Sequence, residues 1–188
     1  VGEYPHQLSG GMQQRAVIAM ALACDPDLLV CDEPASMLDV SLKVNLLNLL
    51  RELSEEEDIS IIYISHDLAS LAHVSDRLAI MYLGRFVEIG ETDRLVSNPK
   101  HPYTASLLEA SPEKDPSIAR ERVLLDGEPP DPIDLSSGCK FADRCPKAQP
   151  ECFDVEPDLD ETETGGQSVA CYFPVEGERL HSELQQGL

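Results

Sequence analysis

Basic residues are scarce in this sequence of 188 residues, which contains 14 lysines and arginines against 35 aspartates and glutamates. The formal net charge of −21 argues against direct binding to nucleic acid or to anionic lipid, because both are polyanions. Only 5 of the basic residues are lysines. An acidic, lysine-poor composition suggests a high-salt cytoplasm that screens the self-repulsion, and an ordinary acidic protein is the plainer alternative.

Long apolar runs and a signal peptide are also missing. No apolar run approaches the roughly 20 residues needed to cross a bilayer, so any role at a membrane is expected to go through a partner. The N-terminus lacks the organisation of a signal peptide, which indicates a cytoplasmic protein. Hydrophobic residues make up 42% of the chain, which is enough for a folded core.

Helix-like and strand-like segments alternate over the first hundred residues, a pattern typical of an open parallel α/β sheet. The predicted helices span 12–24, 41–54 and 67–75, and the predicted strands span 28–31, 59–64, 77–82 and 85–90, the last two around a turn at Gly84. The strand at 28–31 is entirely apolar and is expected to be buried. Beyond Ser111 the periodicity fades and four cysteines follow, so we expect a soft domain boundary between residues 97 and 112.

The first candidate site is a Ser-Gly-Gly sequence at the start of the first predicted helix. Ser9 is a good N-cap, and Gly10 and Gly11 let a ligand approach the bare backbone. Orphan N–H groups and the helix dipole favour an anion there, above all a phosphate. A capped helix after a flexible turn explains the same residues without a ligand.

Acidic residues and a histidine follow the two central predicted strands. Asp32 and Glu33 come directly after the strand at 28–31, and His66 follows the next strand. The carboxyl ends of parallel strands share one sheet edge, where ligands bind, so these residues are expected to lie at the same edge. Asp32 is suited to Mg²⁺, and Glu33 is suited to orienting or deprotonating a water molecule. The plain alternatives are a solvated acidic loop, a turn histidine and, for Asp39, the N-cap of the next helix.

Taken together and in this order, these segments resemble the nucleotide-binding ATPase of ABC transporters. Ser9–Arg15 is similar to the family signature, and Leu28–Glu33 to the Walker B strand with its catalytic glutamate. Ser36–Asp39 is similar to the D-loop, with methionine where many relatives have alanine, and His66 to the switch histidine. The four motifs follow one another at the family's separations, so a chance match is negligible.

The following segment narrows the resemblance. Asn98–Thr104 precedes a short helix through Leu108 and resembles the C-terminal extension of oligopeptide and dipeptide importer ATPases. The resemblance covers roughly residues 2–175. It implies a division into 1–97 as the C-terminal portion of the ATPase domain, 98–175 as the transporter's C-terminal extension, and 176–188 as a tail.

No Gly-x-x-x-x-Gly-Lys-Ser/Thr sequence occurs, so the family's phosphate-cradling P-loop is absent from these residues. The implied fold is of the α/β class: the C-terminal part of a P-loop (RecA-like) ABC nucleotide-binding domain, with a small Cys-rich, metal-binding extension. We therefore expect these 188 residues alone neither to bind ATP tightly nor to hydrolyse it.

The extension contains a candidate metal site of four cysteines: Cys139, Cys145, Cys152 and Cys171. A cytoplasmic location disfavours disulfides, and the spacings of 5, 6 and 18 intervening residues lack the Cys-x-x-Cys pair common at zinc. Chemistry alone leaves zinc and a four-cysteine iron–sulfur cluster equally suitable, with free thiols a third possibility. The resemblance favours a [4Fe-4S] cluster, which some members of the subfamily bear. Cys24 and Cys31 are expected to be small core residues.

The resemblance also implies a role for each site residue, with two ATPase domains closing head to tail around ATP. The residues that would contact the nucleotide held by the other subunit are Ser9, Gly10, Gly11 and Gln13. Asp32 would serve Mg²⁺, and Glu33 would polarise the attacking water. His66 would hold the γ-phosphate and that water, and Asp39 would couple the two sites.

The implied function is that of an importer ATPase on the cytoplasmic side of the membrane. Its expected partners are a second ATPase subunit, transmembrane permease subunits and, indirectly, a substrate-binding protein. A DNA-repair ATPase of the same class would show coiled-coil heptads and a basic surface, which this sequence lacks. Two further hypotheses stay open: a non-catalytic metal-binding or regulatory remnant that docks on importer subunits, and an importer for another solute such as nickel or a sugar.

Overall fold

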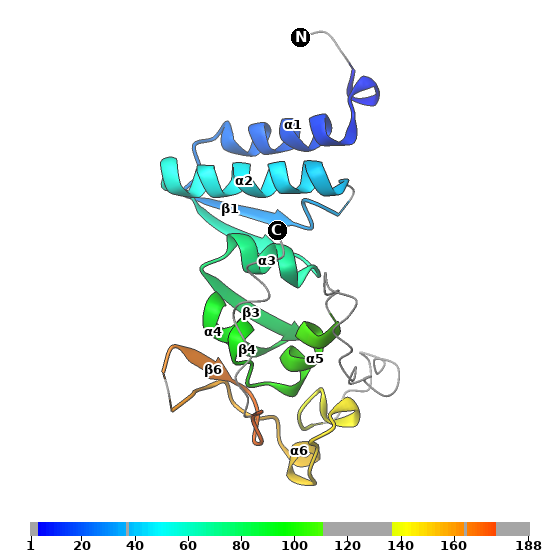
Figure 1. Cartoon of the computed structure of the whole chain (residues 1–188), viewed down its shortest axis with the longest axis vertical. Helices are drawn as coiled ribbons and strands as arrows, with labels where there is room; N and C mark the ends of the chain where they lie inside the picture. Colours follow the sequence, from blue (N-terminus) through cyan, green and yellow to red (C-terminus); the bar gives the residue numbers. More distant parts are fainter. Residues whose placement is uncertain (1–3, 37, 111–136, 164, 176–188) are drawn as a thin grey trace, which may run out of the picture. The chain divides into compact units, whose positions relative to one another are not determined.

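The computed structural model describes residues 4–36, 38–110, 137–163 and 165–175 (Figure 1). Its contacts divide the chain into two compact units, Val1–Val74 and Ser75–Leu188. The predicted tail, 176–188, and the stretch 111–136 lie outside the described residues. No helix in the described ranges is both long and apolar enough to cross a membrane.

The first unit contains three α-helices and a two-stranded parallel sheet. After a short 3-10 turn, Pro5–Gln7, the order is α1 Gly10–Leu22, β1 Leu28–Asp32, α2 Val40–Glu56, β2 Ser60–Ile64 and α3 Leu68–Val74. Strands β1 and β2 pair in parallel, from Leu28 opposite Ser60 to Asp32 opposite Ile64. The sequence predicts each of these elements to within two residues at either end, as shown by the helix expected over 12–24 and found at 10–22.

Both long helices begin at a polar N-cap. The Ser9 side chain accepts a hydrogen bond from the Met12 backbone N–H at the start of α1. The Asp39 carboxylate accepts one from the Leu42 N–H at the start of α2. Helices α1 and α2 each contribute to a core with β1, whose buried members include Ile18, Leu29 and Leu50.

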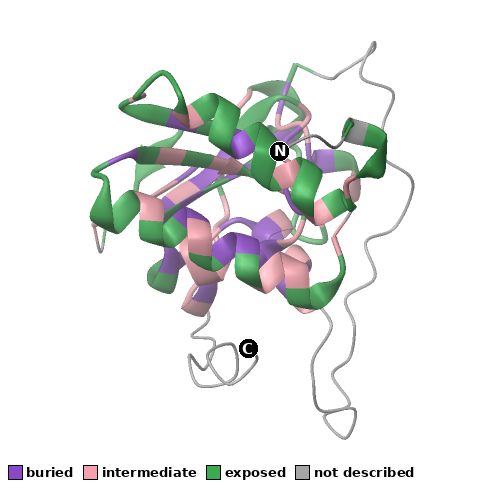
Figure 2. Cartoon of the chain, turned by 90° about the horizontal axis from the view of Figure 1, so that it is seen from above, coloured by how far each residue is buried: buried purple, intermediate pink, exposed green. Residues whose placement is uncertain are grey.

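Only one face of β1 is buried, which corrects the prediction of a fully buried strand. Leu29 and Cys31 are buried, whereas Leu28 and Val30 are 49% and 57% exposed, and Figure 2 maps the burial of each described residue. Alternate side chains of a strand point to opposite faces, so an apolar run alone does not tell how many faces are covered. The residues described in this unit cover the face that carries Leu29.

The second unit is built on an antiparallel sheet of order β3-β4-β6-β5. Its strands are β3 Arg77–Tyr82, β4 Arg85–Glu91, β5 Asp160–Glu161 and β6 Gln167–Val169. Its helices are α4 Thr92–Ser97, α5 Pro102–Ala110, α6 Glu151–Asp154 and the 3-10 turn Ala142–Arg144.

Strands β3 and β4 flank the turn predicted at Gly84 and pair antiparallel, so the parallel sheet expected over the first hundred residues does not include them. Leu83 and Gly84 both have positive φ, 45° and 78°, and form the two-residue turn that joins antiparallel neighbours. Strand β4 then pairs with β6, with Glu88 opposite Val169, so the C-terminal segment completes the same sheet. The chain passes from the first compact unit to the second between residues 74 and 75, which is earlier than the boundary expected between 97 and 112.

A buried histidine in the second unit gives a testable pH dependence. His101 is 1% exposed, its Nδ1 accepts a hydrogen bond from the Tyr103 N–H at 3.0 Å, and burial lowers its pKa to about 4. The unfolded chain takes up this proton near pH 6.5, so stability that is present above pH 6.5 is lost as the pH falls towards 4. We expect the loss to reach about 3 kcal/mol, at about 1.4 kcal/mol per pKa unit.

Urea unfolding at pH 7.5, 6 and 4.5 measures this effect in the chain and in His101→Gln. Glu88, whose pKa burial raises, titrates in the opposite sense in both proteins, so the difference between the two curves isolates the histidine. Equal pH slopes in the two proteins would contradict the prediction.

Candidate functional site

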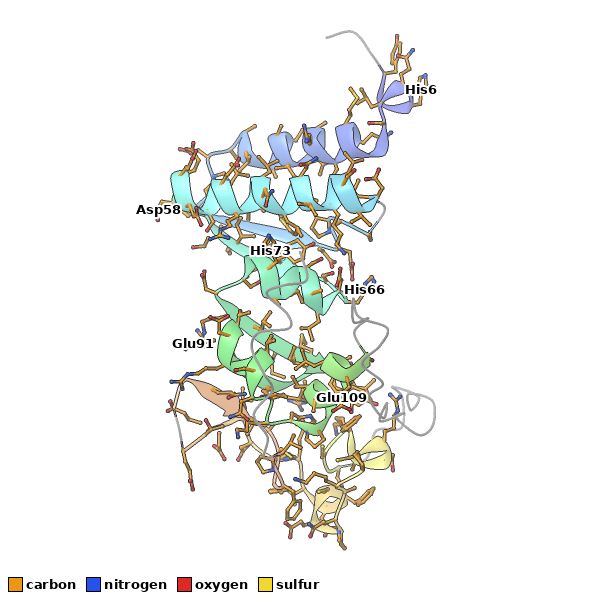
Figure 3. The ribbon with its side chains drawn as sticks, viewed as in Figure 1. His6, Asp58, His66, His73, Glu91 and Glu109 are labelled. Carbon is orange, nitrogen blue, oxygen red and sulfur yellow. The ribbon has the colours of Figure 1, made fainter. Side chains whose placement is uncertain are left out.

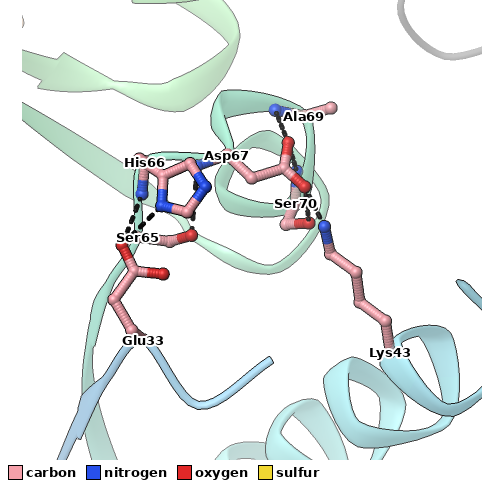
Figure 4. Close-up of polar contacts among 7 residues, drawn as sticks. All are labelled: Glu33, Lys43, Ser65, His66, Asp67, Ala69 and Ser70. Atoms are coloured by element: carbon pink, nitrogen blue, oxygen red, sulfur yellow. Dashed lines mark hydrogen bonds and ion pairs between the residues drawn. The ribbon is translucent and has the colours of Figure 1, made fainter. Parts of the chain in front are cut away.

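The carboxyl ends of β1 and β2 bring a glutamate and a histidine into contact. Glu33 Oε1 accepts hydrogen bonds from the His66 backbone N–H at 3.1 Å and from its ring Nδ1 at 2.7 Å (Figure 4). An ionised carboxylate only accepts hydrogen bonds, so Nδ1 carries the proton and Nε2 keeps its lone pair in the neutral ring. The His66 side chain is 81% exposed, which leaves Nε2 accessible from solvent (Figure 3 labels this residue).

The backbone of Glu33 is held in an uncommon conformation. Its φ of 47° lies in the left-handed region, which costs a non-glycine residue conformational energy. The Glu33 N–H donates to the Ile64 carbonyl at 2.9 Å, and its own carbonyl accepts from the Ser36 hydroxyl at 3.0 Å. These bonds fix the chain just beyond β1 and hold Glu33 beside the end of β2. The sequence carries no signal for this φ.

Asp32 lies at the same sheet edge, as the last residue of β1 and opposite Ile64. Its side chain is exposed, and carboxylate oxygen is the donor type that Mg²⁺ prefers. The expectation that Asp32, Glu33 and His66 share one edge therefore agrees with the strand pairing.

Helix α1 begins at a capped end with two glycines, Gly10 and Gly11, of which Gly11 packs against another helix and Gly10 has open space beside it. A side chain at Gly11 would meet Leu42 at 3.1 Å, so close packing of α1 on α2 already explains this glycine. A side chain at Gly10 would meet nothing within 4 Å, which leaves its backbone open to a ligand. Gln13 Nε2 donates to the Leu8 carbonyl at 3.2 Å.

Asp39 is the N-cap of α2, which is the plain alternative that its residue type predicts. Its Oδ1 accepts from the Leu42 N–H at 2.9 Å and from the Ser41 hydroxyl at 2.7 Å. These hydrogen bonds, that of Leu42 first, lower the pKa of the Asp39 carboxyl and keep it ionised. The N-cap fixes the direction of α2 and so the place of the residues before it.

Sequence reasoning missed the ion pair of Lys43 with Asp67. The only signal for Asp67 is its place at the start of the helix predicted over 67–75, where aspartate is a favoured N-cap. Lys43 gives no signal at all, because 24 residues separate it from its partner.

In the second unit, the four predicted ligand cysteines line one pocket. They share it with His101, Phe141 and Lys147, and the cysteines are Cys139, Cys145, Cys152 and Cys171. Gly138 allows its own segment to lie close to the backbone at Cys152, because a side chain at this position would lie 2.3 Å from the Cys152 carbonyl oxygen. The next residue along, Cys139, donates its N–H to that carbonyl at 2.8 Å.

Three of the four thiols in this pocket, those of Cys139, Cys145 and Cys171, favour the protonated form. Burial raises the pKa of Cys139 and Cys145 and raises that of Cys171 to about 11, and the neighbouring cysteines add to each rise. Among the described residues, no group of three or more His, Cys, Asp or Glu side chains is arranged to hold a metal ion. Neutral thiols pack as small apolar groups, so the four share a pocket without closing on one point. Their donor type fits a thiophilic metal, which must displace the protons.

The other two cysteines differ from each other. Cys31 is buried in the core as expected, and burial raises its pKa. Cys24 is exposed, so its predicted place in the core is wrong. The helix ends at Leu22 and its C-cap is Ala23, so Cys24 lies in the turn that follows, beyond the packed face.

Comparisons with known proteins agree with this geometry. Residues 1–36 match the ABC transporter family, and residues 87–152 match the family described as oligopeptide/dipeptide transporter, C-terminal region. A solved ABC transporter in an inward-facing conformation aligns with 56% of this chain and 40% of its own, with a TM-score of 0.50 and 24% sequence identity, which supports the fold alone.

Similar proteins extend over most of this chain. Dipeptide transport ATP-binding protein DppF of Haemophilus influenzae is 47% identical over 169 residues, 90% of this chain and 51% of its own. Oligopeptide transport ATP-binding protein OppF of Salmonella typhimurium is 49% identical over 162 residues, 85% of this chain and 48% of its own. The chain thus spans about half the length of these curated relatives.

The strand-edge glutamate and histidine, the capped Ser-Gly-Gly helix and these matches define the class: the chain has an ABC ATPase fold and is similar to the ABC transporter ATP-binding proteins. Within that class it is similar to the ATP-binding proteins of oligopeptide and dipeptide transport, including the C-terminal region that the second family describes.

Proposed function

We propose that this chain is the signature, Walker B and switch portion of an ATP-binding subunit that couples ATP hydrolysis to the import of dipeptides or oligopeptides. The observation that carries the proposal is the contact of Glu33 with His66 at the carboxyl edge of β1 and β2. The matches to dipeptide and oligopeptide transport proteins support the substrate class. Its partners are a second ATPase subunit and transmembrane permease subunits, supplied by a substrate-binding protein, at the cytoplasmic face of the membrane.

Each residue of the site has a role in this proposal. Glu33 polarises the attacking water, and its hydrogen bond orients His66 so that Nε2 faces outward to the γ-phosphate and that water. Asp32 holds Mg²⁺, which when bound neutralises phosphate charge. Asp39 couples this site to the second one.

The capped start of α1 binds the nucleotide held by the partner ATPase. Its Ser9 hydroxyl, the open backbone at Gly10, the backbone N–H of Gly11 and the Gln13 side chain meet the terminal phosphate there. Oriented N–H groups and the helix dipole favour that anion. Catalysis of this kind depends on positioning and charge stabilisation, which the two strand ends and the helix start supply.

Transport measurements test this function. We expect vesicles that carry the assembled transporter, with this chain joined to a P-loop-bearing half, to take up a labelled tripeptide only when ATP is present. Ni²⁺ and maltose are the comparison solutes, and preferential uptake of either would overturn the peptide assignment. The 188-residue chain alone is the matched control, and its ATP turnover should stay at background because no P-loop sequence is present.

We also infer that the thiol pocket holds a metal centre, favouring a [4Fe-4S] cluster over zinc. Four thiolates are the ligand set of such clusters, and four cysteines line this one pocket. The cluster would act as a structural staple or as a redox sensor in a segment with few core residues.

Metal analysis of the chain purified without oxygen tests this inference. About four irons and four sulfides per chain, with broad visible absorption, are expected for the cluster. Cys145→Ser should lose this absorption and Cys24→Ser, outside the pocket, should keep it. One zinc without iron would overturn the cluster, and no metal at all would overturn the metal centre.

A further inference from the structure

The turn that carries the switch histidine is held by hydrogen bonds of the residues next to His66, in addition to the contact with Glu33. His66 faces Glu33, and its neighbours close the turn, because the Asp67 N–H donates to the Ser65 hydroxyl at 3.1 Å (Figure 4). Asp67 directly precedes α3. Its Oδ1 accepts a hydrogen bond from the Ala69 N–H at 3.2 Å, and its Oδ2 accepts one from the Ser70 hydroxyl at 2.7 Å. The carboxylate is therefore oriented by the helix that follows the turn.

Lys43 joins this carboxylate to another element. Its Nζ forms an ion pair with Asp67 Oδ2, and the two side chains are 27% and 33% exposed. Burial alone would raise the pKa of Asp67, but the hydrogen bonds from Lys43 and Ser70 lower it overall, so the pair is charged. Lys43 lies in the first turn of α2, where its N–H donates to the Asp39 carbonyl at 2.9 Å.

We propose that Lys43 is a positioning residue of the switch: its ion pair with Asp67 fixes the turn so that His66 meets Glu33, and it ties that turn to the helix that begins at Asp39. The continuous chain of contacts runs from α2 through Lys43 and Asp67 to His66. A shift of α2 thereby reaches His66 through a rigid connection. The inference deepens the proposed function and rests on it.

An ordinary surface ion pair would not have this effect, and α2 supplies one for comparison. Arg51 and Glu55 pair at 2.8 Å one helical turn apart, with side chains 57% and 62% exposed. Both partners lie on α2, and a pair this exposed contributes little. The Lys43 pair is half-buried and joins α2 to the residue that precedes α3. The two ion pairs therefore have the same charges, and the Lys43 pair differs in joining two elements.

Nitrogen NMR of the His66 ring in the chain tests the positioning directly. At a pH where the native ring is neutral, it should be the tautomer with Nδ1 protonated and Nε2 unprotonated, because the bond to Glu33 requires the proton on Nδ1. Lys43→Met should move these signals towards the ordinary mixture of tautomers, Lys43→Arg should restore them, and Arg51→Met should leave them unchanged. Unchanged His66 signals in Lys43→Met would overturn the proposal.

Hydrolysis by the assembled subunit tests the consequence. Lys43→Met should lower kcat about tenfold while the KM for ATP stays within about twofold. The substitution displaces His66, a reacting group, whereas Lys43 itself does not bind the nucleotide. An NMR change with native kcat would overturn the role in hydrolysis. A wild-type subunit without ATP turnover would instead overturn the proposed function, and the NMR comparison would still decide whether Lys43 positions His66.

Discussion

Glu33→Gln in the assembled ATPase lowers kcat by at least about a hundredfold and leaves ATP binding intact. A glutamine side chain keeps the shape of Glu33, and its amide oxygen still accepts the hydrogen bonds from the His66 N–H and Nδ1. The amide cannot take a proton from water or bear the charge that polarises it, and general-base catalysis contributes about 10²–10⁴-fold. With hydrolysis blocked and binding retained, closed ATP-bound dimers should accumulate.

Steady-state phosphate release and size-exclusion chromatography with ATP measure the two parts of this prediction. Glu55→Gln is the matched control, because Glu55 is an exposed carboxylate on α2 that pairs with Arg51. The variant also separates two roles for Glu33. If Glu33 only held His66, the glutamine would preserve that bond and turnover would stay at the native rate, which would refute its role as the base.

The candidate site was predictable from sequence where its geometry is local. Asp32-Glu33 and His66 each follow a short apolar strand, and parallel pairing of those strands places them at one edge. Ser9 and Asp39 were expected as N-caps from residue type alone, and both accept the hydrogen bond of a cap.

The features that escaped prediction depend on contacts distant in sequence. The pairing of β4 with β6 places Glu88 opposite Val169, and no pattern in the sequence indicates that the C-terminal segment joins this sheet. Lys43 and Asp67 are 24 residues apart on different elements, and no periodicity in the sequence indicates that they form a pair. The positive φ of Glu33 likewise follows from the bonds around it.

Removal of one buried carboxylate should cost the second unit much of its stability. Glu88 is 0% exposed and accepts hydrogen bonds from the Lys100 N–H at 2.7 Å, the His101 N–H at 2.9 Å and Gln167 Nε2 at 2.5 Å. It therefore joins β4 to the turn before α5 and to β6, two segments separated by more than sixty residues. Burial raises its pKa and the hydrogen bonds oppose that rise, so the donors around it stabilise the charge.

Glu88→Ala is expected to lower the free energy of unfolding by about 3–5 kcal/mol, because it removes the acceptor of the Lys100 and His101 N–H groups and one of the two acceptors of Gln167 Nε2. Glu88→Gln keeps the volume and one acceptor, and should cost about half as much. Glu91→Ala is the control on the same strand: its carboxylate is 64% exposed, pairs with Arg94 at 3.4 Å, and should change stability by less than about 1 kcal/mol (Figure 3 labels Glu91). Urea unfolding at pH 7.5 measures all three variants. A loss below about 1 kcal/mol in Glu88→Ala would mean that the three donors find other acceptors, and that the turn at 98–101 holds its place without the carboxylate.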